Sequence, residues 1–417
     1  MCKMNSKYIC GMGKCTACNA CVNICPRKCI SLEVDPLNET SSAKINLEKC
    51  IDCKLCEKVC PLQKGIIGNS PYKCFAAWSD NQDVRKTSAS GGVAMELYRY
   101  FLISGGKVAG VKMSSPFEAT FLLTNDVNDV NDFKNSKYVY SDTGNIYQDI
   151  LGVLKAGESA LFIGLPCQVA GLKNYLQIKK ADISNLFTVD LICHGVTPQK
   201  FLMQHIQYVE KKCKRLARSV SFRNPLFDTE KFYFTLKDEG GIFYKKPVKS
   251  DDVYQIAYHS GISYRENCYS CNFANVFRQG DLTLGDFWSV GKTQEVEFEK
   301  KHISCILVNT EKGEKILKNL VKNNKIIIFE RPIEEETRYE RQLNSPTNKN
   351  EIREKFLKYY KLNKNFDKAM RKATFKIRYS NLIKTIIHYE RIKTVLRVWI
   401  PQKYRTKFKQ VKKNSKI

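Results

Sequence analysis

Short apolar runs alternate with amphipathic segments through the middle of the chain. Runs at residues 160–164, 186–192 and 303–308 are rich in Leu, Ile, Val and Phe and have the length of buried strands. Residues 93–102 and 169–176 instead repeat apolar positions at helical spacing. Strands that alternate with helices predict a layered domain. We therefore expect an α+β protein with a mixed α/β domain over residues 71–345.

The two ends of the chain depart from this pattern. Residues 1–70 are dense in cysteine, and a turn-like stretch at residues 65–71 ends that region. Residues 346–417 read as a basic helical extension, with 21 Lys or Arg against four Asp or Glu from residue 351 onward, in a chain of net charge +27. Apolar positions of this extension fall loosely at helical spacing before Pro401: Ile383, Ile386, Ile387, Val395, Leu396 and Trp399.

The charge of the extension suits an anionic partner, or it serves solubility alone. An acidic ferredoxin and an anionic membrane surface both stay open as partners. Nucleic acid is disfavoured, because most of the positive charge lies outside the central domain and no aromatic stacking platform is evident. The sequence shows neither a run of 18 uncharged apolar residues nor a secretory signal, so we expect a cytoplasmic protein, with peripheral membrane association left open.

Two tandem cysteine runs share one spacing, in which three cysteines three residues apart are followed by a fourth and a proline. This spacing is typical of bacterial ferredoxins with two 4Fe–4S clusters. The first three cysteines of a run wrap one cluster, and the fourth reaches the other cluster. Zinc sites use paired CxxC units, and disulfides belong mainly to secreted domains. The predicted ligand sets are Cys15, Cys18, Cys21 and Cys60 for one cluster, and Cys50, Cys53, Cys56 and Cys25 for the other.

Four further cysteines follow on three loops of the central domain. Cys167 comes after one predicted strand, Cys193 after the next, and Cys268 and Cys271 form a CxxC pair. These four thiols could bind a third 4Fe–4S cluster. The alternative is that Cys167 and Cys193 are simply buried apolar thiols. A Ser/Gly turn opens a predicted helix, where backbone N–H groups either receive a phosphate or flavin edge or only cap the helix; it contains Ser88, Ser90, Gly91 and Gly92.

These segments together resemble the coenzyme F420 hydrogenase/dehydrogenase beta-subunit family. The resemblance runs from the Ser/Gly turn through residues 136–141, Gly-Leu-Pro-Cys-Gln at 164–168, Asp-Leu-Ile-Cys-His-Gly at 190–195 and residues 265–271 to Gly-Asp-Phe-Trp at 285–288 and Val-Asn-Thr at 308–310. It implies FAD and a third cluster held by Cys167, Cys193, Cys268 and Cys271. Ser289 stands where the family usually has glycine, and the basic extension is not part of the shared pattern.

The expected function is electron transfer between a ferredoxin-type donor, the clusters, FAD and a small molecule such as coenzyme F420 or a sugar-linked substrate. The alternative is an electron-transfer subunit without its own substrate, docked on a hydrogenase or dehydrogenase or acting in polysaccharide assembly. His194 is a candidate proton donor, or a structural imidazole. Lys137 and Arg265 are candidates for cofactor or substrate anions, and Asp286 for a cofactor ligand or turn cap. The remaining cysteines are expected to be unligated: Cys2, Cys10, Cys29, Cys74, Cys213 and Cys305.

Overall fold

The cysteine-rich region folds as a small three-stranded antiparallel sheet with three short helices. The computed structural model describes residues 6–64, 68–114 and 117–386. The strand order is β1-β3-β2. Asn19 and Lys54 adopt left-handed backbone just after the second cysteine of each run and start α1 and α2, so the two runs repeat in structure as well as in sequence. The elements are β1 (Ser6–Tyr8), α1 (Ala20–Ile24), β2 (Ile30–Val34), β3 (Ser41–Asn46), α2 (Leu55–Val59) and α3 (Pro61–Lys64).

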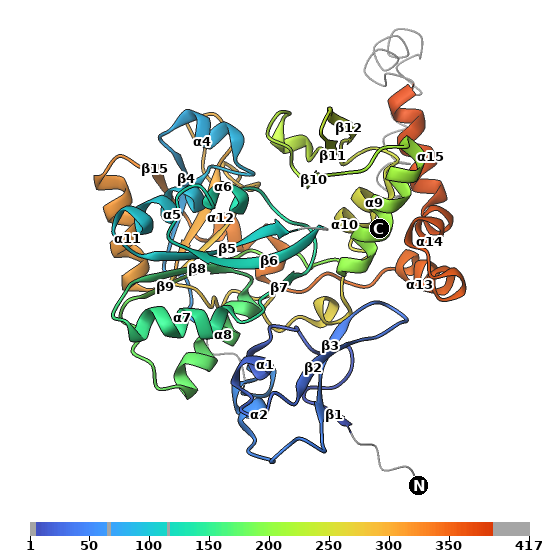
Figure 1. The fold of residues 1–417 in the computed structure, drawn as a ribbon. Coiled ribbons are helices and arrows are strands. Elements are labelled where there is room, and N and C mark those ends of the chain that lie inside the picture. The colour runs from blue at the N-terminus through green and yellow to red at the C-terminus, as the bar shows by residue number, and fades with distance from the viewer. Residues whose placement is uncertain (1–5, 65–67, 115–116, 387–417) are drawn as a thin grey trace.

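A nine-stranded mixed sheet forms the centre of the molecule (Figure 1). Strands β8 and β9 are parallel neighbours, and β13 continues the parallel run beside β9. The three predicted strand segments are confirmed as β8, β9 and β14. The order across the sheet is β15 (Ile326–Arg331), β4 (Lys73–Ser79), β14 (Ser304–Val308), β13 (Leu282–Asp286), β9 (Leu186–Leu191), β8 (Ala160–Gly164), β5 (Lys107–Ser114), β6 (Glu118–Thr124) and β7 (Ser141–Asp142).

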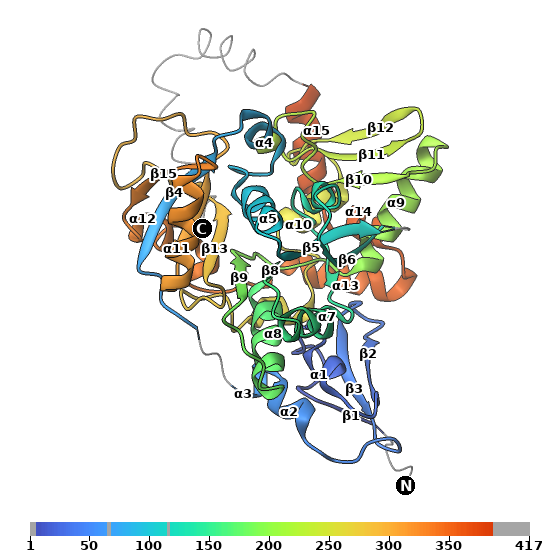
Figure 2. The ribbon, with the colours of Figure 1, turned by 60° about the vertical axis from the view of Figure 1, so that its left-hand side comes forward.

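Helices cover both faces of this sheet, as expected for strands that read as continuous apolar runs. On one face, α5 and α11 pack into an aliphatic and aromatic core with α6. On the other face, α7 and α8 lie between the sheet and the cysteine-rich module (Figures 1 and 2). Short α4 and α12 lie beside the β4 and β15 edge. The helices are α4 (Gln82–Thr87), α5 (Val93–Ile103), α6 (Val130–Phe133), α7 (Ile146–Lys155), α8 (Pro166–Ile178), α11 (Glu311–Lys322) and α12 (Glu334–Thr337).

A second small sheet and the C-terminal helices share one aromatic core. The sheet has the order β10-β11-β12 and packs with α9 and α10. Phe356, Tyr360 and Phe366 from the C-terminal region are fully buried in this core. The elements are α9 (Gln199–Cys213), β10 (Ser219–Ser221), β11 (Phe234–Asp238), β12 (Gly241–Lys246), α10 (Val253–His259), α13 (Glu351–Asn363), α14 (Phe366–Ala373) and α15 (Phe375–Ile386), with one-turn helices at Thr229–Lys231, Glu266–Ser270 and Arg341–Leu343.

The described part of the predicted extension, up to residue 386, is therefore helical, and its first two helices are part of the folded body. Buried His205 of α9 lies between two carboxylates, with Nδ1 3.2 Å from Asp367 of α14 and Nε2 3.0 Å from Asp252, the N-cap of α10. The proposed boundary at residue 346 stays a prediction. The apolar positions at Ile387, Val395, Leu396 and Trp399 lie outside the described residues, as do the side chains of Ile383 and Ile386. Among the described helices, none has the length and apolar character needed to cross a membrane.

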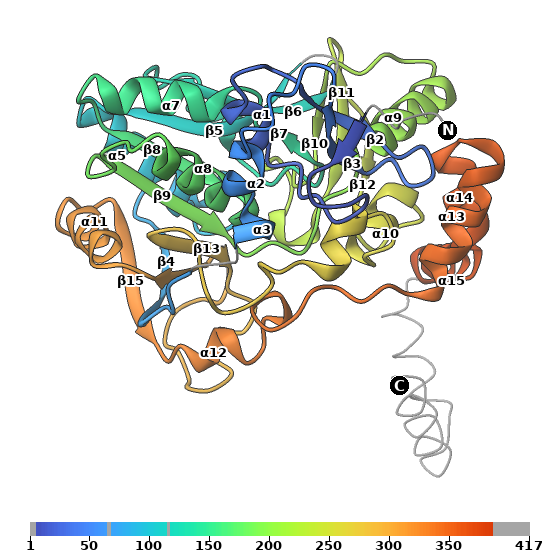
Figure 3. The ribbon, with the colours of Figure 1, turned by 90° about the horizontal axis from the view of Figure 1, so that it is seen from below.

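The cysteine-rich module is docked on the central domain through buried polar contacts. Tyr140 Oη donates to the carbonyl of Ala17 at 2.8 Å, and Thr143 Oγ1 donates to that of Cys18 at 3.1 Å. Asn23 Nδ2 donates to the Gly144 carbonyl at 2.7 Å. Seen from below, α1 to α3 lie over α8 (Figure 3). The module is thus held against the helix whose first turn contains Cys167.

Candidate iron–sulfur and electron-transfer site

The eight cysteines of the tandem runs line two separate cavities of the module, in the sets that the spacing predicted. We call these cavities site A and site B. Each holds one cysteine more than the predicted four, namely Cys10 in site A and Cys29 in site B. Site A is lined by Cys10, Cys15, Cys18, Cys21 and Cys60. Site B is lined by Cys25, Cys29, Cys50, Cys53 and Cys56.

The two sites differ in their access to solvent. The four predicted ligands of site A are buried. In site B, Cys53 is exposed and Cys25, Cys50 and Cys56 are half-buried. Backbone N–H groups of Ala17 and Ala43 point at Cys15 Sγ, at 3.3 and 3.5 Å, as amides do around iron–sulfur clusters. Site B therefore faces the outside of the molecule, whereas site A faces the central domain.

A third cavity, which we call site C, is lined by the remaining predicted ligands, Cys167, Cys193, Cys268 and Cys271. Cys167 is in the first turn of α8, directly after β8, and Cys193 follows β9. Because β8 and β9 are parallel neighbours, their carboxyl ends meet at one edge of the sheet. The turn at Glu266–Ser270 brings Cys268 and Cys271 to the same place. The structure thus gathers four thiols from three distant loops.

Two buried polar networks fix the loops of site C. Gln168 accepts from the Leu165 backbone at 2.9 Å and donates to Ser141, which sets the first turn of α8. Arg278 lies 3.3 Å from Asp190 of β9 and donates to the carbonyl of Leu191 at 3.1 Å. Arg278 follows Cys271 by seven residues and Asp190 precedes Cys193 by three, so this ion pair ties two thiol-bearing loops together.

The chemistry of site C fits an iron–sulfur cluster. Burial raises the pKa of Cys193 to about 12 and that of Cys271 to about 11, and it raises the pKa of Cys167 well above its usual value. Such thiols keep their protons at neutral pH until a metal displaces them. Four thiols around one cavity match the ligand set of a 4Fe–4S cubane, which is bound by four cysteines.

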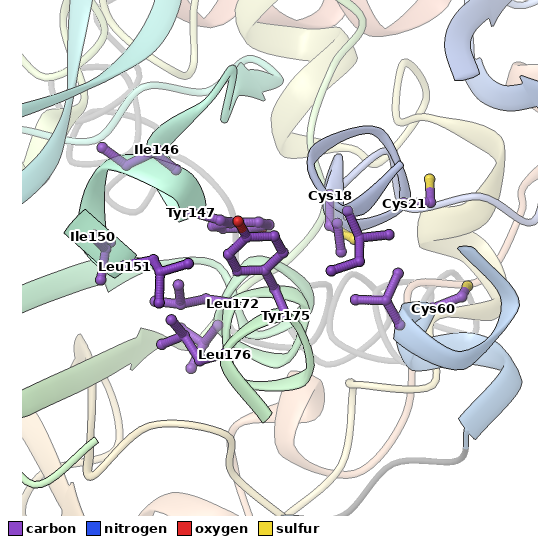
Figure 4. Packing of buried hydrophobic residues seen from close by; sticks show 14 of the residues in the cluster. Cys18, Cys21, Cys60, Ile146, Tyr147, Ile150, Leu151, Leu172, Tyr175 and Leu176 are labelled. Atoms are coloured by element: carbon purple, nitrogen blue, oxygen red, sulfur yellow. The ribbon is translucent and has the colours of Figure 1, made fainter. Parts of the chain in front are cut away.

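Sites A and C are neighbours. Thr16 lines both cavities. Cys18 lies against α8 so closely that a Cβ at Gly171 would come within 3.1 Å of its Sγ, which explains glycine at this helical position. Figure 4 shows Cys18 beside Tyr147 and Tyr175, with Cys21 and Cys60 to its right. Site A therefore adjoins site C, whereas site B lies on the more exposed side of the module.

Arg265 joins sites A and C. Its guanidinium donates to the backbone carbonyls of Thr16 at 2.7 Å, Ser41 at 2.8 Å and Cys15 at 3.2 Å. It also lies over the Tyr140 ring, 4.7 Å from the centroid, and is 2% exposed. These contacts give Arg265 a docking role between module and central domain. Its role as a ligand of a cofactor or substrate anion stays a prediction. Both terminal nitrogens of the guanidinium already donate to backbone carbonyls.

The other predicted cofactor residues lie at the β4, β13 and β14 end of the sheet. Ser90 Oγ donates to the Ile303 carbonyl and Gly91 N–H to Ser304 Oγ, while Ser88 Oγ donates to the Val84 carbonyl. Asp286 is opposite Ser304 in the β13–β14 pair and accepts from Arg223 at 2.7 Å. Gly92 is the left-handed N-cap of α5.

Lys134 and Lys137 lie near the Ser/Gly turn. Lys134 Nζ donates to Oγ1 of Thr87, the residue before that turn, at 2.8 Å. Lys137 Nζ donates to the carbonyls of Asp132 and Lys134, each at 2.8 Å. Loss of hydration lowers the pKa of Lys137 to about 7 and also lowers that of Lys134. Two desolvated amines beside a Ser/Gly turn suit a cofactor that carries phosphate.

His194 lies at the mouth of site C. Its ring is about half exposed, and Nε2 is 4.0 Å from Glu340. Its backbone carbonyl accepts from Thr347 Oγ1 at 3.2 Å. A solvent-accessible imidazole directly after Cys193 is placed to exchange protons with water near this site. Whether it acts catalytically stays a prediction.

Residues 157–334 match the family of the C-terminal part of the coenzyme F420 hydrogenase/dehydrogenase beta subunit, and residues 14–64 match the 4Fe-4S dicluster domain. These two segments belong to those families. All four cysteines of site C fall inside the matched beta-subunit segment. The chain is thus an iron–sulfur electron-transfer protein related to an oxidoreductase family. The Ser/Gly turn and residues 136–141 lie before residue 157, although β4 to β7 belong to the same sheet as the matched strands.

Among solved structures, the chain is similar to a chain of the F420-reducing NiFe hydrogenase complex from Methanosarcina barkeri. The two share 17% sequence identity, and the alignment covers 74% of this chain and 94% of that chain with a TM-score of 0.42. No curated protein sequence matches the chain.

Proposed function

We propose that this beta-subunit-like chain is an iron–sulfur flavoprotein oxidoreductase that carries electrons through sites B, A and C between a ferredoxin-type protein and FAD. Its substrate would be a small molecule such as coenzyme F420 or a sugar-linked compound. The observation that carries the proposal is the convergence of Cys167, Cys193, Cys268 and Cys271 on one cavity beside site A. A third cluster there would extend the two-cluster path into the central domain.

The external redox partner is expected at site B. Cys53 is exposed there, and Ile51 beside it is 60% exposed. Lys7, Arg27 and Lys54 line the same cavity, together with Asp52 and Glu57, which pair with Lys54 and Lys7. The lining thus has a small excess of positive charge. An apolar spot next to basic residues suits a small, transient interface with an acidic electron carrier.

FAD is proposed for the neighbourhood of the Ser/Gly turn. When bound, a flavin supplies conversion between one-electron and two-electron chemistry. Lys137 and Lys134 would hold its phosphates, and Ser90 and Gly91 would border it. The support is that Lys134 donates to Thr87, the residue directly before the Ser/Gly turn. Asp286, fixed by Arg223, would orient its polar edge.

Anaerobic purification followed by iron, sulfide and flavin analysis tests this proposal. We expect about twelve irons per chain, since three cubanes contain four irons each, together with one flavin. The Cys193→Ala variant should lose about four irons, whereas Cys213→Ala, which removes a half-buried thiol at the end of α9, should keep them all. About eight irons in the unaltered chain would exclude a cluster at site C.

A second candidate function is an electron-transfer subunit without its own substrate. The matched family is described as a beta subunit, which favours an assembly with other chains. The two candidates differ in turnover. If the purified chain oxidises reduced ferredoxin only when a hydrogenase or dehydrogenase partner is added, and never with F420 alone, the subunit function is the better description.

A further inference from the structure

Site B contains a fifth cysteine that the ligand spacing does not require. Cys29 lines the same cavity as Cys25, Cys50, Cys53 and Cys56 and is 6% exposed. Its Sγ lies 3.4 Å from Cys25 Sγ. A cubane takes four cysteine ligands. One thiol at this site is therefore in excess. It lies beside Cys25, the predicted fourth ligand, and it also interacts with Cys50.

The backbone explains why Cys29 returns to this corner. The chain turns directly after Cys25, with the Lys28 N–H donating to the Cys25 carbonyl at 3.2 Å. Lys28 has the left-handed backbone that such a turn requires, with φ of 48°. The Cys29 carbonyl then accepts from the Asn46 N–H at 2.8 Å, which anchors it to the end of β3. Cys29 is thus fixed beside Cys25 by the fold.

The second cysteine run has no such thiol after its fourth cysteine. After Cys60 the chain continues into α3, and Lys64 occupies the position that corresponds to Cys29. A fifth thiol still lines site A, but it comes from a different place, Cys10, which interacts with Cys15 and Cys60. Both cavities of the module therefore carry an extra thiol next to the fourth ligand.

We propose that Cys29 is a reserve ligand of the cluster at site B. With a cluster bound through Cys25, the Cys29 S–H would donate a hydrogen bond to the Cys25 sulfur. If Cys25 were lost as a ligand, the Cys29 sulfur would take its place on iron and its proton would pass to the Cys25 sulfur, with no change of oxidation state. Such a reserve is useful at site B, because this site faces solvent and is the more open to loss of its cluster. The inference concerns site B alone and is independent of a cluster at site C.

Iron and sulfide counts on a set of full-length variants test the proposal. Cys25→Ala should keep the iron content of the unaltered protein after anaerobic reconstitution, whereas Cys25→Ala with Cys29→Ala should lose about four irons. Cys53→Ala, at a corner where no other thiol is expected to substitute, should lose iron as the double variant does. The matched control is Cys25→Ala with Cys10→Ala, which removes the extra thiol of the other cavity and should retain the site B cluster; Cys10→Ala alone gives its baseline.

Two results would overturn the proposal. One is a Cys25→Ala protein that loses as much iron as the double variant while its circular dichroism shows a folded chain. The other is loss of four irons from Cys29→Ala alone, which would make Cys29 the resident ligand.

Cys29→Ala also provides a test that does not depend on a missing ligand. Removing an S–H donor should move the potential of the site B cluster to a lower value in EPR-monitored titration, because hydrogen bonds to sulfur favour the reduced cluster. An unchanged potential would exclude the contact.

Discussion

Replacement of Arg265 by methionine is expected to loosen the cysteine-rich module from the central domain. Methionine keeps an apolar stem against Tyr140 but leaves the carbonyls of Thr16, Cys15 and Ser41 without their donor. A hydrogen bond from a charged group contributes about 1.5–3 kcal/mol, and such contributions are not additive. We expect local opening of the interface to become easier by about 3–5 kcal/mol.

Hydrogen exchange measures this opening directly. Since about 1.4 kcal/mol corresponds to a factor of ten, amides in segments 13–18, 40–43 and 264–268 should exchange about 10²- to 10³-fold faster in the Arg265→Met protein. Amides of β8 and β9, which do not touch the guanidinium, should be unchanged. Arg218→Met is the matched control, because Arg218 is 71% exposed and its ion pair is with exposed Glu239. Exchange at the wild-type rate in the Arg265→Met interface would refute the docking role.

Three further predictions concern other parts of the molecule. Burial opposes the charge of His205, but Asp252 and Asp367 outweigh this effect and raise the pKa of His205 to about 10. The contribution of His205 to stability is therefore complete below about pH 6.5 and is lost as the pH rises through about 10. His205→Asn should flatten the decline of the unfolding free energy between pH 7 and 10, and an unchanged slope would contradict this. Burial raises the pKa of Glu336 to about 8, so the stability that this group contributes falls as the pH rises from about 4.5 through 8. The melting temperature of Glu336→Gln should therefore exceed that of the wild type by a margin that grows above pH 5. A difference in melting temperature that does not change with pH would exclude the shift. If the basic extension contacts a membrane, deletion of residues 387–417 should reduce co-sedimentation with anionic liposomes, and binding that survives this deletion would rule out these residues as the contact. Deletion from residue 351 should instead unfold the α9–α10 core that contains Phe356 and Tyr360.

The candidate cluster ligands of the module could be predicted because three of each four lie within one short run, and the repeat of that run supplies the fourth. Three cysteines three residues apart can reach one cubane whatever the rest of the chain does. The convergence at site C needed more, since Cys167 and Cys193 are brought together only if β8 and β9 are parallel neighbours. The apolar runs before each cysteine carried that signal.

Contacts between segments far apart in the chain could not be predicted from the sequence. Cys10 and Cys29 have no ligand spacing, and only the turn at Lys28 and the position of β3 place Cys29 beside Cys25. Arg265 reads as a lone basic residue, and nothing local indicates that its partners are carbonyls about 250 positions earlier in the chain. Its burial follows from the docking of two domains.

The C-terminal region contains an amphipathic helical pattern that its many basic residues make hard to recognise. Ile352, Phe356 and Tyr360 recur at intervals of four residues, which is the spacing of one helical face. The lysines and arginines between them dominate the composition and suggest a solvated tail. In the structure this apolar face is buried, and Arg353 donates to the Ile262 carbonyl at 2.7 Å and to Tyr269 Oη at 3.0 Å.

These contacts connect the C-terminal helices to the electron-transfer sites. Arg353 also pairs with Glu266 at 3.0 Å, so α13 braces the turn that carries Cys268. Seven residues further along α13, Tyr360 Oη donates to Glu39 of the module at 2.8 Å. One helix therefore contacts both the loop of site C and the module that holds sites A and B. Together with Arg265, α13 therefore fixes the module against the loop of site C. If clusters occupy both sites, as proposed, these contacts would hold their separation constant.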